Sequence, residues 1–301
     1  MGPAEAVSFM VGQCGLRRGA RSATEAEGYV LYAFLNTLPL RLRQFCLPHP
    51  QLTGATALAG NLRYADGAMS DSRQEFAERR FAHAWTPSRF DLTRAARLRE
   101  LLARRPRGRL LDVGCYDGQF ISQILDQRDG DGVIGLDVAH AALRAARNRG
   151  LRPVRGQVEA ALPFASNSFA TVVAAEVIEH VFDTQAVFLE LARVLQPGGW
   201  LALTTPNLVA LSGRAQLLLG RSPHNVEFDA GPGTSGHIRY FTFDTLELLL
   251  RRAGLEPLGR WTNVAHFSVL GSSEWVGRLR PSLGHTLISV SRKPHADRSR
   301  P

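Results

Sequence analysis

The chain has 301 residues, of which 45% are hydrophobic and 21% are charged, and its formal net charge is +9 at pH 7. That apolar content excludes an intrinsically disordered chain, and the length allows one large domain or one domain with an appendage. No apolar run reaches the ~20 residues that span a bilayer, and residues 1–20 lack the basic start and apolar core of a secretion signal. We therefore expect a cytoplasmic protein without a transmembrane segment.

The positive charge is unevenly distributed. Most of the excess lies in residues 1–106, and Lys293 is the only lysine among 36 basic residues. Such heavy use of arginine is explained more simply by a GC-rich coding sequence than by phosphate contacts, so no nucleic-acid partner is favoured. Cys14, Cys46 and Cys115 lack metal-type spacing and indicate neither a disulfide framework nor a zinc site.

Residues 1–88 are predicted to form an N-terminal extension that is partly helical. Residues 1–23 show no pattern and are compatible with disorder. Residues 24–46 form an apolar helical segment, for which packing over a functional site is favoured over contact with a partner or a membrane surface. Residues 71–85 are a further predicted helix.

Residues 89–293 have the pattern of one α/β domain, which a tail at 294–301 follows. Strand and helix patterns alternate at short spacing from residue 107, which predicts a doubly wound, mostly parallel sheet of seven strands with helices on both faces. The helix at 183–195 is expected to be closed by Pro197–Gly199. The predicted strands are 109–113, 132–137, 151–155, 170–175, 200–204, 256–262 and 285–292, and the predicted helices are 91–104, 118–127, 139–149, 183–195 and 243–253.

A connection of about 36 residues separates the fifth strand from the helix at 243–253, whereas such connections usually have about 2–6 residues. This insert, residues 206–241, contains a predicted helix at 207–219 and a glycine-rich stretch at 230–236. Long connections usually carry function, so we predict a lid over a bound substrate. The insert ends with His237, which could instead anchor the returning loop, and with two candidate substrate contacts, Arg239 and Tyr240. Arg239 could hold an acidic group of the substrate or pair with a local carboxylate.

The stretch 109–119 is the most informative part of the sequence. An apolar strand carries Asp112, a turn with Gly114 and Gly118 follows, and a helix begins directly afterwards. Glycines let the backbone turn sharply and approach a ligand, and the start of a helix offers unpaired N–H groups. The order predicts a site for a nucleotide-like cofactor, and NAD-binding folds share such a turn.

Five sequence blocks, in order and spacing, narrow that prediction. Together they resemble class I S-adenosylmethionine-dependent methyltransferases over about residues 90–292. Two segments, Thr205–Asn207 and Gly236–Thr242, resemble the branch that methylates small molecules, including the ubiquinone-pathway O-methyltransferases. The resemblance implies a Rossmann-like fold, S-adenosylmethionine as cofactor and a small-molecule acceptor, with oxygen as the leading acceptor atom. The five blocks are Leu110–Gly118, Val133–Asp137, Leu162–Phe164, Glu176–His180 and Arg193–Gly199.

The resemblance also assigns residues to parts of the cofactor. Asp112 would face the ammonium of the methionine part, and Asp137 would accept hydrogen bonds from both ribose hydroxyls. The amide oxygen of Gln157 and the N–H of Val158 would bond to the adenine. The other implied cofactor residues are Gly114, Cys115, Gly118, Val138 and Glu176.

Two residues depart from the family pattern. Tyr116 stands where a glycine is common, so its ring must turn outward or the loop must lie farther from the cofactor. Gln157 stands where an aspartate is common, although its amide oxygen can still accept a bond from adenine. Asp137 has an alternative role as N-cap of the helix at 139–149, and it could serve both purposes.

Three ionisable residues, Glu176, Glu179 and His180, follow the fourth strand, at the carboxyl edge where an open parallel sheet binds its ligands. In the ubiquinone-pathway relatives a Glu-x-x-Glu-His group of this kind is associated with a divalent metal. Here a cap of the following turn is favoured over a metal site. His180 and His237 are the two candidate bases for a substrate hydroxyl proton.

Two alternatives to a small-molecule methyltransferase stay open. The basic N-terminal region would suit an RNA or protein methyltransferase, although we identify no RNA-binding module in the sequence. The second alternative is a non-catalytic partner protein of the same fold, because Tyr116 and Gln157 depart from the pattern. A calorimetric titration with S-adenosylmethionine discriminates between an enzyme and such a partner, and the sequence predicts neither the acceptor molecule nor the oligomeric state.

Overall fold

The structure is a computed structural model that describes residue 78 and residues 86–125, 132–227, 234–267 and 271–295. The chain divides into two units, Met1–Asp66 and Gly67–Pro301. All of the described residues belong to the second unit, so the fold and the site below are those of that unit.

Most predictions for the N-terminal extension fall outside the described residues. These are the disorder at 1–23, the apolar helix at 24–46 and nearly all of the helix at 71–85, in which Glu78 is helical. The end of the tail, residues 296–301, is also outside them. Within the described part of the chain, no helix is both long enough and apolar enough to cross a membrane.

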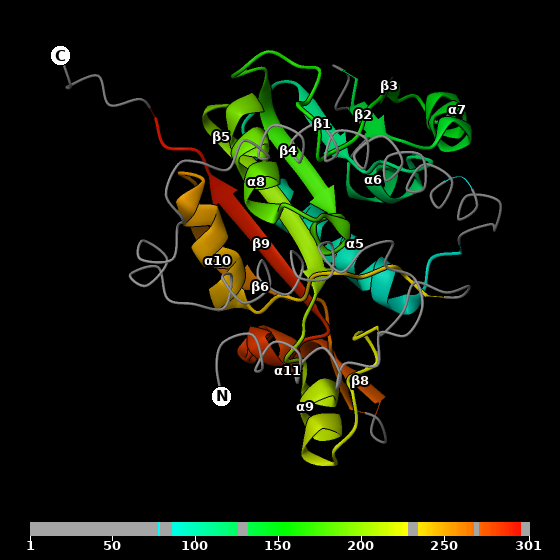
Figure 1. Ribbon diagram of the computed structural model, residues 1–301, viewed down its shortest axis with the longest axis vertical. Helices are drawn as coiled ribbons and strands as arrows, with labels where there is room; N and C mark the ends of the chain where they lie inside the picture. The colour runs from blue at the N-terminus through cyan, green and yellow to red at the C-terminus, as the bar shows by residue number, and fades with distance from the viewer. Residues whose placement is uncertain (1–77, 79–85, 126–131, 228–233, 268–270, 296–301) are drawn as a thin grey trace, which may run out of the picture. The chain divides into compact units, whose positions relative to one another are not determined.

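The second unit contains a sheet of seven strands in the order β3-β2-β1-β4-β5-β9-β6 (Figure 1). Neighbouring strands from β3 to β5 are parallel, whereas β9 runs antiparallel to both of its neighbours, β5 and β6. The predicted seven-stranded, mostly parallel sheet is therefore confirmed. The strands are β1 Leu110–Val113, β2 Ile134–Asp137, β3 Arg152–Arg155, β4 Phe169–Ala175, β5 Leu195–Pro206, β6 Glu256–Trp261 and β9 Thr286–Arg292.

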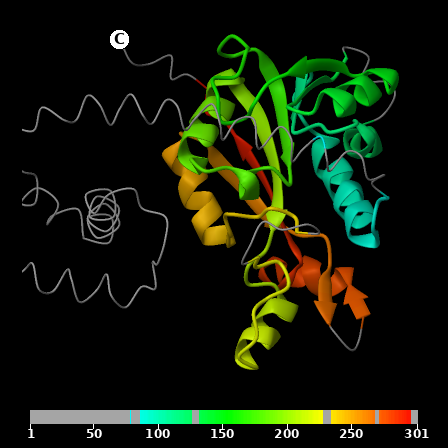
Figure 2. The ribbon, with the colours of Figure 1, turned by 45° about the vertical axis from the view of Figure 1, so that its right-hand side comes forward.

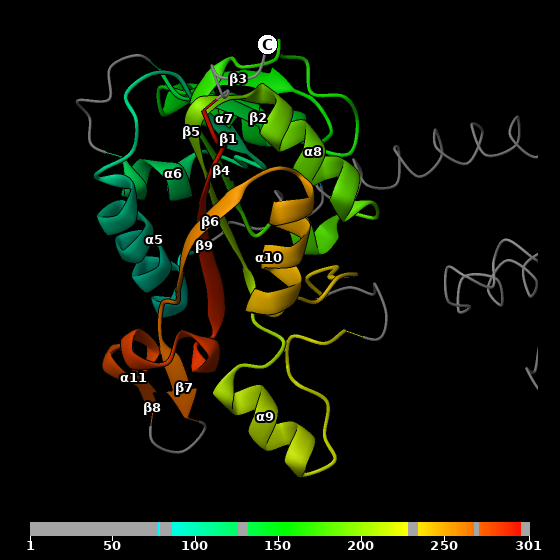
Figure 3. The same ribbon diagram turned by 90° about the vertical axis from the view of Figure 1, so that its left-hand side faces the viewer.

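Helices cover both faces of the sheet, as predicted (Figure 3). On one face α5, α6 and α7 contribute to an apolar cluster that includes Leu98, Ile121 and Leu143. On the other face α8 and α10 contribute to a cluster that includes Phe188 and Leu246. These side chains are buried, so each stabilises the fold by about 1.5–3 kcal/mol. The helices are α5 Arg89–Leu102, α6 Gln119–Ile124, α7 His140–Asn148, α8 Thr184–Val194 and α10 Phe243–Arg252.

The fifth strand is longer than the predicted 200–204. Helix α8 ends at Val194 and β5 begins at once with Leu195, so the expected break at Pro197–Gly199 lies inside the strand, where the pairing with β4 shifts register. Gly198 has a φ of +80°, a conformation that glycine adopts without strain. The glycines therefore bend the start of a strand instead of separating it from the helix.

Several short elements lie beyond the carboxyl edge of the parallel strands (Figures 1 and 2). Helix α9 begins at Leu211 instead of residue 207, because the Asn207 amide donates to the carbonyl oxygens of Ser282 and Gly284, at 3.0 and 2.7 Å, and holds a turn. The small β7–β8 sheet and α11 were missing from the prediction. The elements are α9 Leu211–Leu218, β7 Ala265–Phe267, β8 Gly271–Ser273, α11 Glu274–Leu279 and two 3-10 turns, Ile178–His180 and Pro281–Leu283.

Candidate functional site

The turn between β1 and α6 passes repeatedly through the left-handed region. Gly114, Tyr116 and Gly118 have φ values of +69°, +50° and +78°. That conformation suits glycine and disfavours other residues by about 1–2 kcal/mol. The N–H groups of Gly114 and Cys115 donate to the Leu136 carbonyl oxygen at 2.8 and 3.1 Å and tie the turn to β2. Tyr116 thus holds a strained conformation where the sequence departs from the family pattern.

Gly114 has no room for a side chain. A Cβ atom there would lie 2.6 Å from Cγ2 of Val177, so the backbone of the turn must stay bare. Gly114→Ala is expected to lower the free energy of unfolding by about 2 kcal/mol, because alanine adds both steric overlap and strain at positive φ. Chemical denaturation measures the loss.

Two variants separate the causes of that loss. Trimming the neighbour in Gly114→Ala/Val177→Ala should recover the steric part alone. The control Gly220→Ala measures the strain alone, because Gly220 has a φ of +68° and an added Cβ would meet nothing within 4 Å. If Gly114→Ala were no less stable than Gly220→Ala, the close contact with Val177 would be refuted.

Asp137 ends β2 and holds the turn in place. Its carboxylate oxygens accept hydrogen bonds from the N–H groups of Tyr116 and Ala139, each at 2.9 Å. The N-cap residue of α7 is Ala139, so the alternative N-cap role predicted for Asp137 was wrong; Asp137 instead holds the N–H of the residue that caps the helix. Burial raises the pKa of Asp137, and the backbone hydrogen bonds oppose that rise. Lone pairs remain on both oxygens for a ligand.

Asp112 is a buried carboxylate with no cationic partner among the described residues. It lies in β1 and is 4% exposed. Burial raises its pKa well above the usual range, and the nearby carboxylate of Asp137 raises it further. Neither influence favours the charged form. A cationic group bound beside Asp112 would supply the missing interaction.

The residues predicted to bind ribose and adenine lie at neighbouring strand ends. Asp137 pairs with Arg155 in the parallel ladder of β2 and β3, and Gln157 and Val158 follow directly after β3. Val158 packs against the apolar core, and Gln157 is partly buried. This is the edge of an open α/β sheet where nucleotide-like ligands bind.

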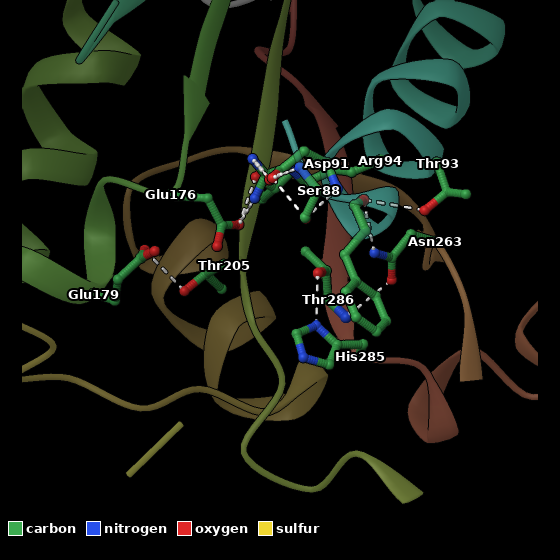
Figure 4. Close-up of polar contacts among 12 residues, drawn as sticks. Ser88, Asp91, Thr93, Arg94, Glu176, Glu179, Thr205, Asn263, His285 and Thr286 are labelled. Carbon is green, nitrogen blue, oxygen red and sulfur yellow. Dashed lines mark hydrogen bonds and ion pairs between the residues drawn. The ribbon is translucent and has the colours of Figure 1, made fainter. Parts of the chain in front are cut away.

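Glu176 is held by an arginine that was missing from the prediction. Its Oε1 accepts from the Thr204 hydroxyl at 2.9 Å and forms an ion pair with Arg94 Nη1 at 2.8 Å. Arg94, from α5, is 8% exposed and also pairs with Asp91 at 2.9 Å (Figure 4). An arginine on the buried face of a predicted helix, one turn before Leu98, is the signal that indicates a buried carboxylate partner.

The structure brings together a different trio from the predicted metal residues. Ligand atoms of Glu179, His180 and His237 lie within 4.8 Å of one another, and Glu176 is not part of the group. Glu179 is 1% exposed; one of its oxygens accepts from Thr205 Oγ1 at 3.0 Å, and the other has no partner among the described residues. Burial, and then the charge of Glu176, raise the pKa of Glu179.

The two candidate bases, His180 and His237, are neighbours with ring centres 5.0 Å apart. Nδ1 of His180 lies 3.0 Å from the Gly236 carbonyl oxygen. A carbonyl oxygen can only accept, so Nδ1 of His180 carries a proton. Nδ1 of His237 is buried and has no partner in the described part of the chain.

The end of the insert is fastened to the turn that carries Glu179. The N–H groups of Ile238 and Arg239 donate to the Glu179 carbonyl oxygen at 2.9 and 3.0 Å. This docking is what places His237 beside His180. The glycine-rich part of the predicted lid, residues 228–233, lies outside the described residues.

Both predicted substrate contacts have partners inside the protein. The Arg239 guanidinium donates to the Phe182 carbonyl oxygen at 2.6 Å and lies over the Phe182 ring. The Tyr240 hydroxyl accepts from the Glu227 N–H at 2.7 Å. These contacts hold the insert, and a substrate role for either residue stays a prediction.

Comparison with known proteins identifies the family. A family model described as a methyltransferase domain matches residues 76–258, more than half of the chain. The ubiquinone biosynthesis O-methyltransferase of Bordetella avium is 30% identical over 189 residues, which are 59% of this chain and 72% of that protein. The 27-O-demethylrifamycin SV methyltransferase of Amycolatopsis mediterranei is 30% identical over 235 residues, 66% of this chain and 82% of that protein. A solved methyltransferase from Methanosarcina mazei, 17% identical, covers 65% of this chain and 98% of its own, with a TM-score of 0.49.

The family match confirms the resemblance seen in the five sequence blocks, all of which lie between its ends. It confirms S-adenosylmethionine as the cofactor. The chain belongs to the class I S-adenosylmethionine-dependent methyltransferases.

Proposed function

We propose that this protein transfers the methyl group of S-adenosylmethionine to a hydroxyl oxygen of a small molecule. The two relatives described above are both named for methylation at oxygen. The observation that carries the proposal is Asp112, a buried carboxylate with no cation beside it in the described part of the chain, next to a turn in which Gly114 has no room for a side chain. An ammonium group fits that position.

The residues at the edge of the sheet suit the whole cofactor. Asp112 would pair with the ammonium group, Asp137 would accept from the ribose hydroxyls, and the adenine would lie against Gln157 and Val158. When bound, S-adenosylmethionine supplies a methyl group on a positively charged sulfur, which a nucleophilic oxygen attacks in line. The protein's task is therefore to hold the acceptor oxygen in line and to exclude water. The backbone of Gly114, Cys115, Gly118 and Val138 and the side chain of Glu176 would complete the cofactor site.

A base would assist when the acceptor is a hydroxyl group. His180 is one candidate for this role, because the Gly236 carbonyl orients its ring through Nδ1. His237 is the neighbouring candidate. An acceptor oxygen bound beside these two histidines would lie near the end of the insert.

Asp137→Asn is expected to weaken S-adenosylmethionine binding by about 10–100-fold, because charge-assisted hydrogen bonds to the ribose are lost. Isothermal titration calorimetry measures the affinity, and circular dichroism checks that the fold is retained. Asp244→Asn is the control, since Asp244 is exposed on α10 and should bind as the wild type does. Unchanged affinity in Asp137→Asn would refute the ribose assignment.

The reaction itself is tested with purified protein, S-adenosylmethionine and a panel of phenols, alcohols, carboxylic acids and amines. We expect S-adenosylhomocysteine and an O-methylated product by mass spectrometry. Methylation of amines alone would overturn the assignment to oxygen. Failure of the folded protein to bind S-adenosylmethionine would overturn the proposed function as a whole.

A further inference from the structure

A cavity of about 210 Å³ lies beyond the carboxyl edge of the sheet, on the side of α9 and β7. Its wall comes from the start of α5, the insert, β7 and the start of β9. Most of its lining residues belong to the insert 206–241, which was predicted to cover a substrate, although none of them was named as a candidate catalytic residue. Its aromatic and polar wall residues include Phe90, Gln216, His224, Asn225, His266 and His285.

One side of the cavity is aromatic. The Phe90 ring stacks on the His285 imidazole, with ring centres 4.6 Å and planes 22° apart, and His266 meets Phe90 edge-on at 5.7 Å. Such a surface favours a flat ring over an aliphatic chain. An apolar cavity of about 150 Å³ holds benzene, so this cavity has room for one six-membered ring with small substituents.

The polar part of the wall is held in place by neighbouring groups. The Asn225 amide donates to the Asn207 carbonyl oxygen at 3.3 Å. Nδ1 of His266 lies 3.0 Å from Oγ of Ser272. A wall that is already ordered loses little conformational entropy when a ligand binds.

His285 joins the cavity to the proposed cofactor site. It lines the cavity, and it lies close enough to Glu176 for that carboxylate to influence its pKa (Figure 4). Burial lowers the pKa of His285; the charges of His266 and Arg94 lower it further, and those of Glu176 and Asp91 oppose the shift. The imidazole is therefore neutral at pH 7 and can accept a proton.

We propose that this cavity binds the ring of a phenol-type acceptor with its hydroxyl at His285, and that His285 accepts the hydroxyl proton during methyl transfer. The inference rests on the proposed function and names the substrate class and the acceptor site. It puts the acceptor on the Arg94 side of Glu176 and makes His285 the base in place of the two candidates named above, His180 and His237.

Methyl transfer to the phenol needs no group other than the acceptor, S-adenosylmethionine and His285. The phenol oxygen forms a bond to the methyl carbon as the carbon–sulfur bond breaks, and the electron pair of that bond stays on sulfur. The phenol proton moves to the His285 imidazole, which then releases it to water. The products are an aryl methyl ether, S-adenosylhomocysteine and one proton.

The acceptor site is tested by measuring the binding of 4-fluorophenol with fluorine NMR. Saturating S-adenosylhomocysteine keeps the cofactor site filled without allowing methylation. We expect 4-fluorophenol to bind, and phenol to compete with it far better than cyclohexanol, which has a similar size but no flat ring.

Two variants locate the bound probe. Phe90→Ala should weaken binding by about tenfold through loss of ring stacking. Ser212→Phe should abolish binding, because it fills the cavity from α9 and leaves the aromatic side intact. Leu218→Phe, on the same helix at an 88% exposed position, is its matched control and should bind normally. If Phe90→Ala fails to fold, Ser212→Phe alone decides.

The role of His285 has its own readout. Its imidazole C–H signal, identified by its loss in His285→Asn, should shift when 4-fluorophenol binds, and the pKa of His285 should fall because the phenol hydroxyl donates to the neutral ring. The signal of the exposed His140, identified in His140→Asn, should not move. An unmoved His285 signal would overturn the proposal.

The outcomes separate the two proposals. A folded protein that fails to bind S-adenosylhomocysteine or S-adenosylmethionine contradicts the proposed function. A protein that binds S-adenosylhomocysteine but not 4-fluorophenol contradicts only the acceptor site. If Ser212→Phe binds 4-fluorophenol as well as the wild type does, only the proposed acceptor site is contradicted.

Discussion

Asp112→Asn is expected to stabilise the ligand-free protein by about 1–3 kcal/mol at pH 7 and to weaken S-adenosylmethionine binding by about 100-fold or more. Both effects have one cause. Asp112 is buried, and its surroundings raise its pKa, so the fold gains nothing from its charge. The bound ammonium group is the partner that would make that charge favourable.

The sign of the pH dependence follows from the raised pKa. The native state binds the Asp112 proton more tightly than the unfolded state does, so this residue's contribution to stability declines as pH rises from the ordinary value of 3.8 to the raised one. Affinity for S-adenosylmethionine should rise over the same interval, because the cofactor favours the carboxylate. Binding in that interval should release a proton.

Urea denaturation at several pH values measures the stability of wild type and Asp112→Asn, and the variant should lose the decline. Calorimetry in two buffers of different ionisation enthalpy measures the released proton. Asp244→Asn is again the control, because Asp244 is 81% exposed and loses only a surface ion pair with Arg260, which should change stability by about 0–1 kcal/mol. If Asp112→Asn bound the cofactor normally, Asp112 would not face the ammonium group.

Elements with a clear apolar pattern, or with a place in the alternation of strands and helices, could be predicted from the sequence, and the shortest elements could not. All seven strands of the main sheet were expected: β1 and β4 are apolar runs, whereas β3 and β6 carry polar residues and follow from their place after a helix. The strands β7 and β8 have three residues each, too few to show a period of two. The start of α9 was placed too early because the turn before it depends on hydrogen bonds from the Asn207 side chain to a distant segment.

In the candidate site, too, some residues could be predicted from local sequence and others could not. Asp112 and Asp137 follow from local sequence, because the ends of parallel strands share one edge. The ion pair of Arg94 with Glu176 depends on how α5 docks on the sheet, which no local pattern reports. His237 reaches His180 only because the insert folds back onto the turn after β4, so the trio at that turn could not be predicted from spacing.

Arg94→Met is expected to lower the free energy of unfolding by about 3–5 kcal/mol. The Arg94 side chain is 10% exposed, forms ion pairs with Asp91 and Glu176, and lies 4.6 Å from the centre of the Phe120 ring. Methionine preserves much of the volume but leaves Glu176, which is 27% exposed, without its cation. Removing one partner of a largely buried pair leaves the other charge uncompensated, and that charge dominates the loss.

The double variant Arg94→Met/Glu176→Gln tests that cause. It removes the stranded charge, so it should be more stable than Arg94→Met alone, even though it carries one more substitution. A surface pair gives the comparison: Arg292 and Glu256 are 45% and 49% exposed, and Arg292→Met should cost only about 0–1 kcal/mol. Urea denaturation of the three variants and the wild type reports all of these differences. If the double variant were as unstable as Arg94→Met, the loss would come from packing against Phe120 instead of from the charge on Glu176, and the ion pair would not be what holds α5 against the end of β4.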